Sequence, residues 1–158
     1  LEVGKDVLFA DQYRLVIGYT EQEMAAIYSG MDVLMSVSMG EGFGIPIVEA
    51  QACGTPVIVG AWTSMEELCF AGWMVPKQEA DAWWTPLAAY QWVPRIGAIY
   101  ERLEAAYGAA RDEALRRKAR EGALAYSADR ITECYWRPAL AMLRDRVLDV
   151  AAVRRVLR

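Results

Sequence analysis

The sequence predicts an α/β fold in which a parallel sheet is flanked by helices and followed by a helical C-terminal tail. Strand-length apolar runs alternate with segments of helical periodicity over residues 32–75, and the last third of the chain is helical in pattern. A length of 158 residues fits one domain, and 55% hydrophobic with 24% charged residues is a usual globular composition. We therefore expect a folded chain with its own core.

The first thirty residues contain two short apolar runs and one well-marked helix. Residues 7–9 and 15–17 are strand-length, so we predict short strands there. Thr20 and Glu23 have the spacing of a capping box, in which each side chain accepts a hydrogen bond from the other residue's backbone amide. The spacing predicts a helix over residues 21–29. Its apolar face is expected to contain Met24, Ile27 and Tyr28.

A buried strand, a glycine-rich loop and a helix come next. Residues 32–37 are almost all apolar, which is typical of a central parallel strand buried on both faces. A loop with several glycines follows over residues 39–44. Pro46 then marks the start of a helix that ends near residue 53, because proline is tolerated in a first helical turn. Residues 55–59 form the next predicted buried strand.

Helices dominate the remainder of the chain. A short helix capped by residues 63–66 and a strand over residues 72–75 precede an aromatic-rich connection, which holds one short strand or a hairpin. We expect Pro138 to kink or split the last helix, because proline lacks an amide hydrogen and clashes with the preceding turn. The three predicted helices span residues 96–107, 111–126 and 128–148.

Charge and composition exclude several function classes. The net charge of −4 argues against nucleic-acid binding, which needs concentrated lysine and arginine. Thirteen of the 17 basic residues lie in residues 102–158, where a solvated helix face is the simplest interpretation and a membrane-surface or domain-docking face is the alternative. The chain has no histidine and no C-x-x-C pair, so it has no Ser-His-Asp triad and no zinc-finger pattern.

The cysteines indicate a reducing environment. The simplest interpretation of three widely spaced cysteines is that they are small buried core residues. Unpaired cysteines fit a reducing compartment, so we expect a cytoplasmic protein. Neither a signal peptide nor a membrane-spanning apolar run is visible. The chain begins at Leu1 rather than at a methionine, so we expect an upstream segment. The cysteines are Cys53, Cys69 and Cys134.

The most informative stretch places two glutamates around a predicted helix start. Glu41 lies in the glycine-rich loop and Glu49 lies about one turn into the helix. Carboxylates accept hydrogen bonds from vicinal hydroxyls, while the amides and dipole of a helix N-terminus attract phosphate. A nucleotide-sugar has hydroxyl-rich rings on both sides of a diphosphate, so this pattern fits a nucleotide-sugar better than a bare phosphate.

At these residues the sequence resembles the donor-binding, C-terminal half of GT-B retaining glycosyltransferases of family four. The segment GEGFGIPIVEAQACGTPVI holds the Glu-x7-Glu signature of that family, and the resemblance covers about residues 5–145. It implies a Rossmann-like sheet within a partial donor domain over residues 1–126. Residues 127–158 would be C-terminal helices that pack toward an acceptor domain absent from this chain.

The resemblance also implies residue roles. Glu41 would be the catalytic-site carboxylate that contacts the transferred sugar, and Glu49 would hold the ribose hydroxyls. The donor sugar and diphosphate would lie along Gly42, Phe43, Gly44, Ile45 and Ile47. The loop beside the base would contain Gly18, Tyr19 and Thr20.

The resemblance implies that the enzyme uses a nucleoside-diphosphate sugar as co-substrate. Such enzymes need no cofactor and usually no metal. The glycine-rich opening of the donor domain, with its arginine and lysine, is absent from this sequence. We therefore expect the chain alone to be inactive. The alternatives are a non-catalytic Rossmann-like interaction domain, or a GT-B relative such as a sugar-nucleotide epimerase or a phosphorylase.

The aromatic residues of the connection after residue 75 have two interpretations. Trp83, Trp84, Tyr90 and Trp92 form either a core or domain interface, which is the more frequent use of such aromatics, or a sugar-stacking platform. Ser64 and Glu66 are simplest as helix-capping residues.

Overall fold

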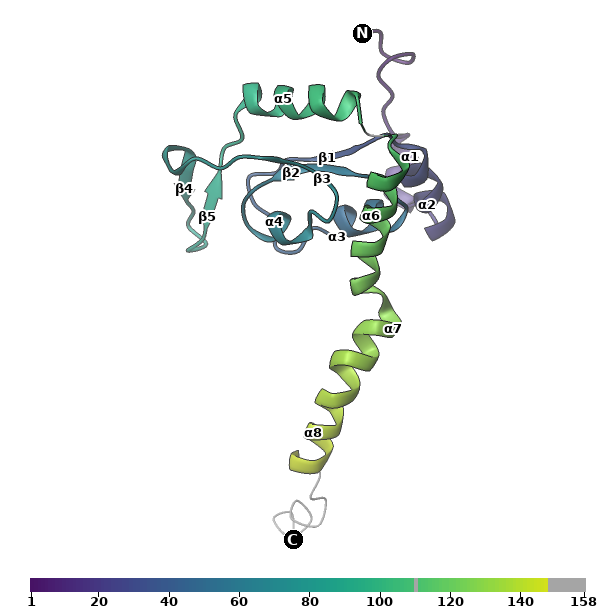
Figure 1. Ribbon diagram of the computed structural model, residues 1–158, viewed down its shortest axis with the longest axis vertical. Coiled ribbons are helices and arrows are strands. Elements are labelled where there is room, and N and C mark those ends of the chain that lie inside the picture. The colour runs from purple at the N-terminus through teal and green to yellow at the C-terminus, as the bar shows by residue number, and fades with distance from the viewer. Residues whose placement is uncertain (110, 148–158) are drawn as a thin grey trace.

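The computed structural model describes residues 1–109 and 111–147, and it is an α/β fold built on a three-stranded parallel sheet (Figure 1). The strands are β1 (Leu34–Ser36), β2 (Val57–Gly60) and β3 (Gly72–Val75), in the spatial order β1-β2-β3. Helices α3 (Ile45–Ala52) and α4 (Ser64–Leu68) cover one face of the sheet and α5 (Ile96–Tyr107) covers the other. The predicted fold class is confirmed.

The core is centred on β2. All four residues of this strand are buried, because it pairs with β1 on one side and β3 on the other and is covered on both faces. Gln51 of α3 is fully buried and uses its carboxamide to join three segments. Its Nε2 donates to the carbonyls of Ile47 and Leu68, and its Oε1 accepts from the amides of Phe70 and Ala71. This buried polar group is therefore satisfied.

The predicted central strand is wrong in one respect. Residues 34–36 do form a parallel strand, but β1 is at the edge of the described sheet, and Met35 is 51% exposed. The apolar run alone could not distinguish a strand with two neighbours from one with a single neighbour. Among the residues that the structure describes, β2 is the strand buried on both faces.

The N-terminal region also differs from the prediction. Residues 15–17, predicted as a strand, belong to helix α1 (Gln12–Ile17), and residues 7–9 contain only an isolated bridge from Val7 to Val3. The Asp11 side chain caps α1 by accepting a hydrogen bond from the Arg14 amide at 3.0 Å. This local cap favours a helix, and among the described residues no strand lies beside the segment to pair with it. The next helix, α2 (Glu21–Gly30), begins with the predicted capping box, which is confirmed.

The start of α4 is not capped as expected. Thr63 precedes the helix with a positive φ of 54°, and its side chain makes no capping bond. Its hydroxyl instead donates to the Trp62 carbonyl at 2.7 Å, while the Ser64 hydroxyl donates to the Glu41 carbonyl at 3.2 Å. Both side chains thus contact the loop before α4 and the glycine-rich loop rather than the first turn of their own helix.

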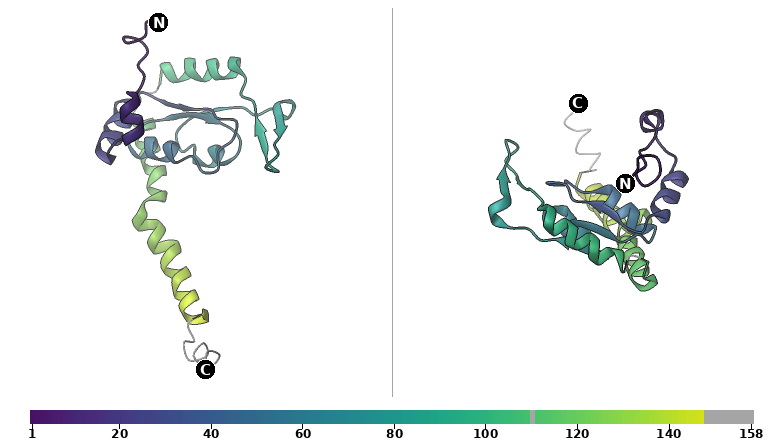
Figure 2. Two further views of the ribbon diagram at one scale, coloured as in Figure 1. Left: turned by 180° about the vertical axis from the view of Figure 1, so that it is seen from behind. Right: turned by 90° about the horizontal axis from the view of Figure 1, so that it is seen from above.

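The aromatic connection folds as a hairpin at the carboxyl end of the sheet (Figure 2). A 3₁₀ turn (Glu79–Asp81) leads into β4 (Ala82–Trp84), which pairs antiparallel with β5 (Tyr90–Trp92). The predicted hairpin is confirmed, but its aromatic residues do not form a core. Trp92 is partly buried against the main core, whereas Trp83, Trp84 and Tyr90 are more than half exposed.

The C-terminal helices extend away from the sheet as an arm (Figure 1). Helix α6 (Glu113–Ala123) packs on α3, and a 3₁₀ turn (Leu124–Tyr126) leads into α7 (Ala128–Ile131). A π-helical segment (Thr132–Trp136) then separates α7 from α8 (Arg137–Val147). The split lies just before Pro138, as expected from the amide that proline lacks. The predicted helix end at Leu148 lies outside the described residues.

Candidate functional site

The glycine-rich loop connects the carboxyl end of β1 to the start of α3. Gly44 is the N-cap residue, with a φ of 92°, and a Cβ added there would lie 2.9 Å from Ile47 Cδ1, so the close turn depends on glycine. The amides of Gly44 and Ile45 donate to no group among the described residues. The Ile47 amide, by contrast, donates to the Gly44 carbonyl at 3.0 Å. The free donors at this helix start are therefore Gly44 and Ile45.

Glu41 is held in place by the loop between β2 and α4. Its amide donates to Thr63 Oγ1 at 3.2 Å, its carbonyl accepts from the Ser64 hydroxyl, and its carboxylate accepts from the Ser38 hydroxyl at 2.8 Å. Main-chain and side-chain atoms of this residue are thus fixed by three different partners. The carboxylate keeps free lone pairs, so it can still accept hydrogen bonds from a ligand.

The conformation of Thr63 adds a local sign of function. A non-glycine residue at positive φ is uncommon and costs about 1–3 kcal/mol, and such residues concentrate at functional sites. Trp62, beside it, is 2% exposed and donates from Nε1 to the Ser38 carbonyl at 3.0 Å. The buried indole of Trp62 anchors the loop after β2 to the loop after β1. The hydrogen bond from the Glu41 amide is accepted by Thr63, the residue with positive φ.

Glu49 contacts a buried tyrosine of α2. The hydroxyl of Tyr28 donates to Glu49 Oε2 at 3.0 Å, and Tyr28 is 6% exposed. Burial, and then the hydrogen bond to Glu49, raise the pKa of Tyr28 to about 12. The tyrosine therefore stays protonated and remains a hydrogen-bond donor to the carboxylate across the physiological range.

A cavity of about 390 Å³ brings Glu49 together with part of the predicted base-side loop. Tyr19, Glu49 and Tyr28 line it, along with residues of α2 and α3. Of the other two residues of that loop, Gly18 ends α1, and the Thr20 side chain is used for the capping box. The structure therefore places one of the three base-side residues beside the predicted ribose carboxylate.

Arg14 lies near this loop. Its guanidinium group lies 4.9 Å from the centre of the Tyr19 ring and pairs with Glu23. The contact stacks a cation on the ring and holds the loop against the capping box.

The other predicted site residues differ in their burial and contacts. Phe43 is half exposed and its ring packs edge-on against Tyr126 at 5.8 Å, so it contacts the 3₁₀ turn that follows α6. Ile47 is fully buried beneath Gly44, and Ile45 is exposed. Gly42 lies exposed in the loop. The Phe43 and Ile45 side chains are therefore open to solvent near the helix start, whereas the Ile47 side chain belongs to the core.

Several contacts of this site were not predicted from the sequence. Tyr28 was assigned to the apolar face of its helix, which is correct for the ring but not for the hydroxyl. Ser38, three residues before Glu41, and Thr63, assigned to a helix cap, contact Glu41. Their signal is weak, because tyrosine, serine and threonine are common in cores, loops and caps.

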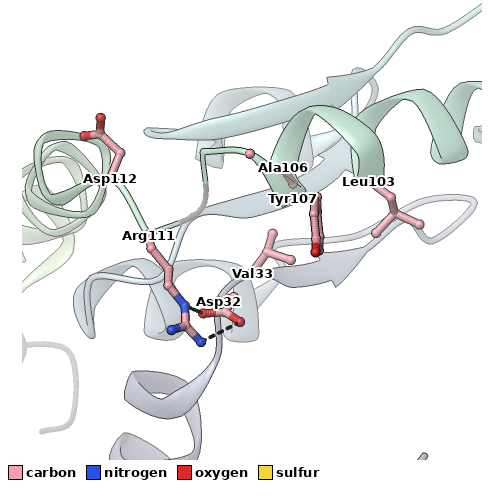
Figure 3. A pocket seen from close by; sticks show the side chains of 8 residues that line it. Asp32, Val33, Leu103, Ala106, Tyr107, Arg111 and Asp112 are labelled. Atoms are coloured by element: carbon pink, nitrogen blue, oxygen red, sulfur yellow. Dashed lines mark hydrogen bonds and ion pairs between the residues drawn. The ribbon is translucent and has the colours of Figure 1, made fainter. Parts of the chain in front are cut away.

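A larger cavity, of about 790 Å³, lies at the opposite end of β1 (Figure 3). It is lined by Val33, Leu103 and Tyr107, and by the ion pair in which Arg111 Nε lies 2.6 Å from Asp32 Oδ1. Ligands of open parallel sheets bind at the carboxyl ends of the strands. The glycine-rich loop follows the carboxyl end of β1, and α3 connects it to Glu49 in the smaller cavity, so these two features form the better candidate site.

The described residues contain no cluster of three or more histidine, cysteine, aspartate or glutamate side chains that could hold a metal ion. Within the same ranges, no helix has the length and apolar character needed to cross a membrane. Of the cysteines predicted to be buried, Cys53 and Cys69 pack against the core, and burial raises the pKa of the Cys69 thiol to about 11. Cys134 is exposed on the C-terminal arm, so its predicted core position is wrong.

Three known proteins illustrate the similarities of the sequence. A D-inositol 3-phosphate glycosyltransferase of Saccharomonospora viridis is 32% identical over 136 residues, which cover 82% of this chain and 28% of that protein. A protein of the same name from Mycobacterium marinum is 26% identical over 98% of this chain and 30% of its own length. O-antigen chain mannosyltransferase B of Escherichia coli is 34% identical over 42% of this chain and 18% of its own length. No solved structure matches the chain.

The chain spans less than a third of the length of these relatives. The family model described as "Glycosyl transferases group 1" matches residues 6–89, a range that contains the glycine-rich loop, both glutamates and β1 to β3. The resemblance to family-four GT-B glycosyltransferases is thereby confirmed, and the chain belongs to the family of glycosyl transferases group 1.

Proposed function

We propose that the chain is the donor-binding part of a retaining glycosyltransferase, which transfers a sugar from a nucleoside-diphosphate sugar to an acceptor. The observation that carries this proposal is the pair of glutamates on either side of a helix start with free amides. Glu41 is fixed beside the glycine-rich loop, Glu49 lines a cavity with Tyr19, and the Gly44 and Ile45 amides lie between them in the chain.

Each part of a nucleotide-sugar has a matching group in this arrangement. The ribose hydroxyls would donate to the Glu49 carboxylate, with the base beside Tyr19 in the same cavity. The diphosphate would accept hydrogen bonds from the amides of Gly44 and Ile45, where the positive end of the α3 dipole adds attraction. Glu41 would accept hydrogen bonds from hydroxyls of the transferred sugar.

Transfer would need an acceptor side that faces this site. The names of the relatives support glycosyl transfer, and each of those proteins is more than three times the length that the chain matches. The arm presents exposed apolar side chains, Tyr135, Trp136, Leu140 and Leu143, that would pack against such an acceptor domain. In this proposal the enzyme uses no resident metal or cofactor. Its location in the cytoplasm stays a prediction.

Titration with uridine diphosphate tests the donor-site proposal. In the ¹⁵N-labelled chain, we expect the amide signals of residues 42–49 to shift, and Glu49→Ala to weaken binding several-fold. The direction of the change in affinity is informative, because removing a nearby carboxylate that had no ligand contact would strengthen the binding of an anionic ligand. Glu104→Ala, an exposed carboxylate of α5, is the matched control and should bind as the parent does. Unchanged or tighter binding by Glu49→Ala would refute the ribose role.

A further inference from the structure

One face of the β4–β5 hairpin is turned toward the glycine-rich loop. Trp83 and Gln91 are directly paired across the two strands, so their side chains share that face. The Trp92 amide donates to the Met39 carbonyl at 2.9 Å, which attaches the hairpin to the loop. A Cβ added to Gly40 would lie 3.3 Å from Gln91 Cγ and 3.7 Å from Thr63 Cγ2. Gln91 therefore reaches the residue that precedes Glu41.

The opposite face of the hairpin is occupied by its own contacts. The rings of Trp84 and Tyr90 lie 4.8 Å apart, those of Tyr90 and Trp92 lie 6.1 Å apart, and Lys77 Nζ lies 5.5 Å from the centre of the Trp92 ring. Arg95 forms two hydrogen bonds to the Asp81 carboxylate, at 2.6 and 3.0 Å, at the base of the hairpin. These contacts make the hairpin an ordered support for the face that carries Trp83 and Gln91.

The two residues of the loop-facing side have unused binding capacity. Trp83 is 54% exposed, and its ring contacts no other ring among the described residues. The Gln91 carboxamide, although partly buried, makes no hydrogen bond within the same ranges. The hairpin thus brings an apolar ring face and an unpaired group with both donors and acceptors to the edge of the Glu41 loop.

We propose that Trp83 and Gln91 form a subsite for a pyranose ring of the acceptor, next to Glu41. This inference rests on the proposed function and names the substrate class of the same site. The indole covers the C–H face of the sugar, and the carboxamide hydrogen-bonds its ring hydroxyls. The surface area of one indole ring and one carboxamide is far smaller than the roughly 800 Å² that each partner of a stable protein interface buries. The two side chains therefore fit a sugar ring better than a protein partner.

The position of the subsite favours the acceptor over the transferred sugar. Gln91 lies against Gly40, which precedes Glu41, whereas the proposed diphosphate contacts lie after it, at Gly44 and Ile45. Glu41 therefore separates the two groups of contacts along the loop. A sugar on the Gly40 side meets the transferred sugar at Glu41, which is where an acceptor hydroxyl is needed.

The test follows the indole signals of the six tryptophans in the ¹⁵N-labelled chain saturated with uridine diphosphate. The probes are methyl α-D-glucopyranoside and methyl α-D-mannopyranoside, with glycerol as a polyol that has no ring face. We expect at least one pyranoside, and not glycerol, to shift the Trp83 indole signal. Trp83→Ala and Gln91→Ala should each lose the remaining pyranoside-induced shifts in residues 40–42, and Trp83→Phe should retain part of them.

The controls separate this inference from the donor-site proposal. Tyr107→Ala and Gln78→Ala replace an exposed aromatic residue and an exposed glutamine away from the hairpin face and should bind the pyranoside as the parent does. Trp83→Ala and Gln91→Ala should keep the parental affinity for uridine diphosphate and for uridine diphosphate glucose. Absence of a pyranoside shift in the parent, or a several-fold loss of affinity for the nucleotide-sugar alone, would overturn the acceptor subsite. Loss of nucleotide binding by Glu49→Ala would still support the donor site.

Discussion

At the scale of single residues, the candidate site depends on hydroxyl groups that hold carboxylates. Ser38 donates to Glu41 and Tyr28 donates to Glu49, so each glutamate of the signature has a hydroxyl partner from another segment. A carboxylate that is already oriented loses less side-chain entropy when a ligand binds. We infer that these hydroxyls preorganise the two glutamates.

Replacing Tyr28 by phenylalanine tests this contact through the pH dependence of stability. The pKa of Tyr28 is raised to about 12 in the folded chain, above the value of about 10 for a free tyrosine. Its contribution to stability is therefore fully present below about pH 10 and is lost as the pH rises toward 12, because the unfolded chain ionises first. We expect the parent's free energy of unfolding to fall more steeply over this range than that of Tyr28→Phe.

Urea unfolding at several pH values measures this difference. Tyr107→Phe is the matched control, because Tyr107 is 93% exposed and its removal should leave the pH dependence as in the parent. Parallel pH curves for the parent and Tyr28→Phe would contradict the buried contact. The same variant should also bind uridine diphosphate more weakly, since Glu49 loses the donor that orients it.

At the scale of elements, the close packing of β2 and β3 depends on Gly72. This residue has a φ of 144°, and a Cβ added there would lie 1.9 Å from the Val57 carbonyl oxygen. The two strands would have to separate to accommodate any side chain. Because β2 is the centre of the core, such a shift would disturb packing on both faces of the sheet.

Two glycine variants form a matched pair for this prediction. Gly72→Ala should lower the free energy of unfolding by more than about 3 kcal/mol or prevent folding. Gly97→Ala, in the first turn of α5 where a Cβ meets nothing within 4 Å, should raise it by up to about 1 kcal/mol. Urea unfolding compares the two, and a Gly72→Ala chain as stable as the parent would contradict the described strand packing.

The elements with strong local signals are those that the sequence predicts well. The capping box at Thr20, the helix over residues 96–107 and the strand over residues 72–75 each have a pattern that is complete within a few residues, and the structure confirms them. Residues 15–17 were wrongly predicted as a strand, because their apolar side chains suit either structure. The Asp11 side chain caps α1 and thereby favours the helix. Met35 was predicted to be buried, because a sequence pattern does not count the neighbours of a strand.

The same distinction applies to the candidate site. The glycine-rich loop and the two glutamates are contiguous, so their relation to the helix start could be predicted. The contacts of Thr63 with Glu41 and of Tyr28 with Glu49 join residues 22 and 21 positions apart. Such contacts follow from the packing of whole elements, and no local pattern marks them.

At the scale of the whole molecule, the distribution of positive charge limits the affinity for an anionic donor. In residues 1–101 the only cations are Lys5, Arg14, Lys77 and Arg95. The structure uses them elsewhere: Lys5 pairs with Glu2, Arg14 with Glu23 and Arg95 with Asp81, while Lys77 lies over Trp92. None of these four cations is therefore placed to attract a diphosphate at the glycine-rich loop, where the start of α3 supplies the positive end of a helix dipole.

This charge distribution predicts weak donor binding and no sugar transfer by the chain alone. A helix dipole near an exposed surface contributes only about 0.3–1 kcal/mol, and salt screens it. The ribose contacts at Glu49 add a few hydrogen bonds, so we expect a dissociation constant for uridine diphosphate in the millimolar range, or about 4 kcal/mol of binding. Amide shifts in residues 42–49 at high ligand concentration would measure it, and raising the salt concentration should weaken it further. Micromolar binding or sugar transfer by this chain would contradict this prediction, because neither could come from the α3 dipole and two carboxylates alone.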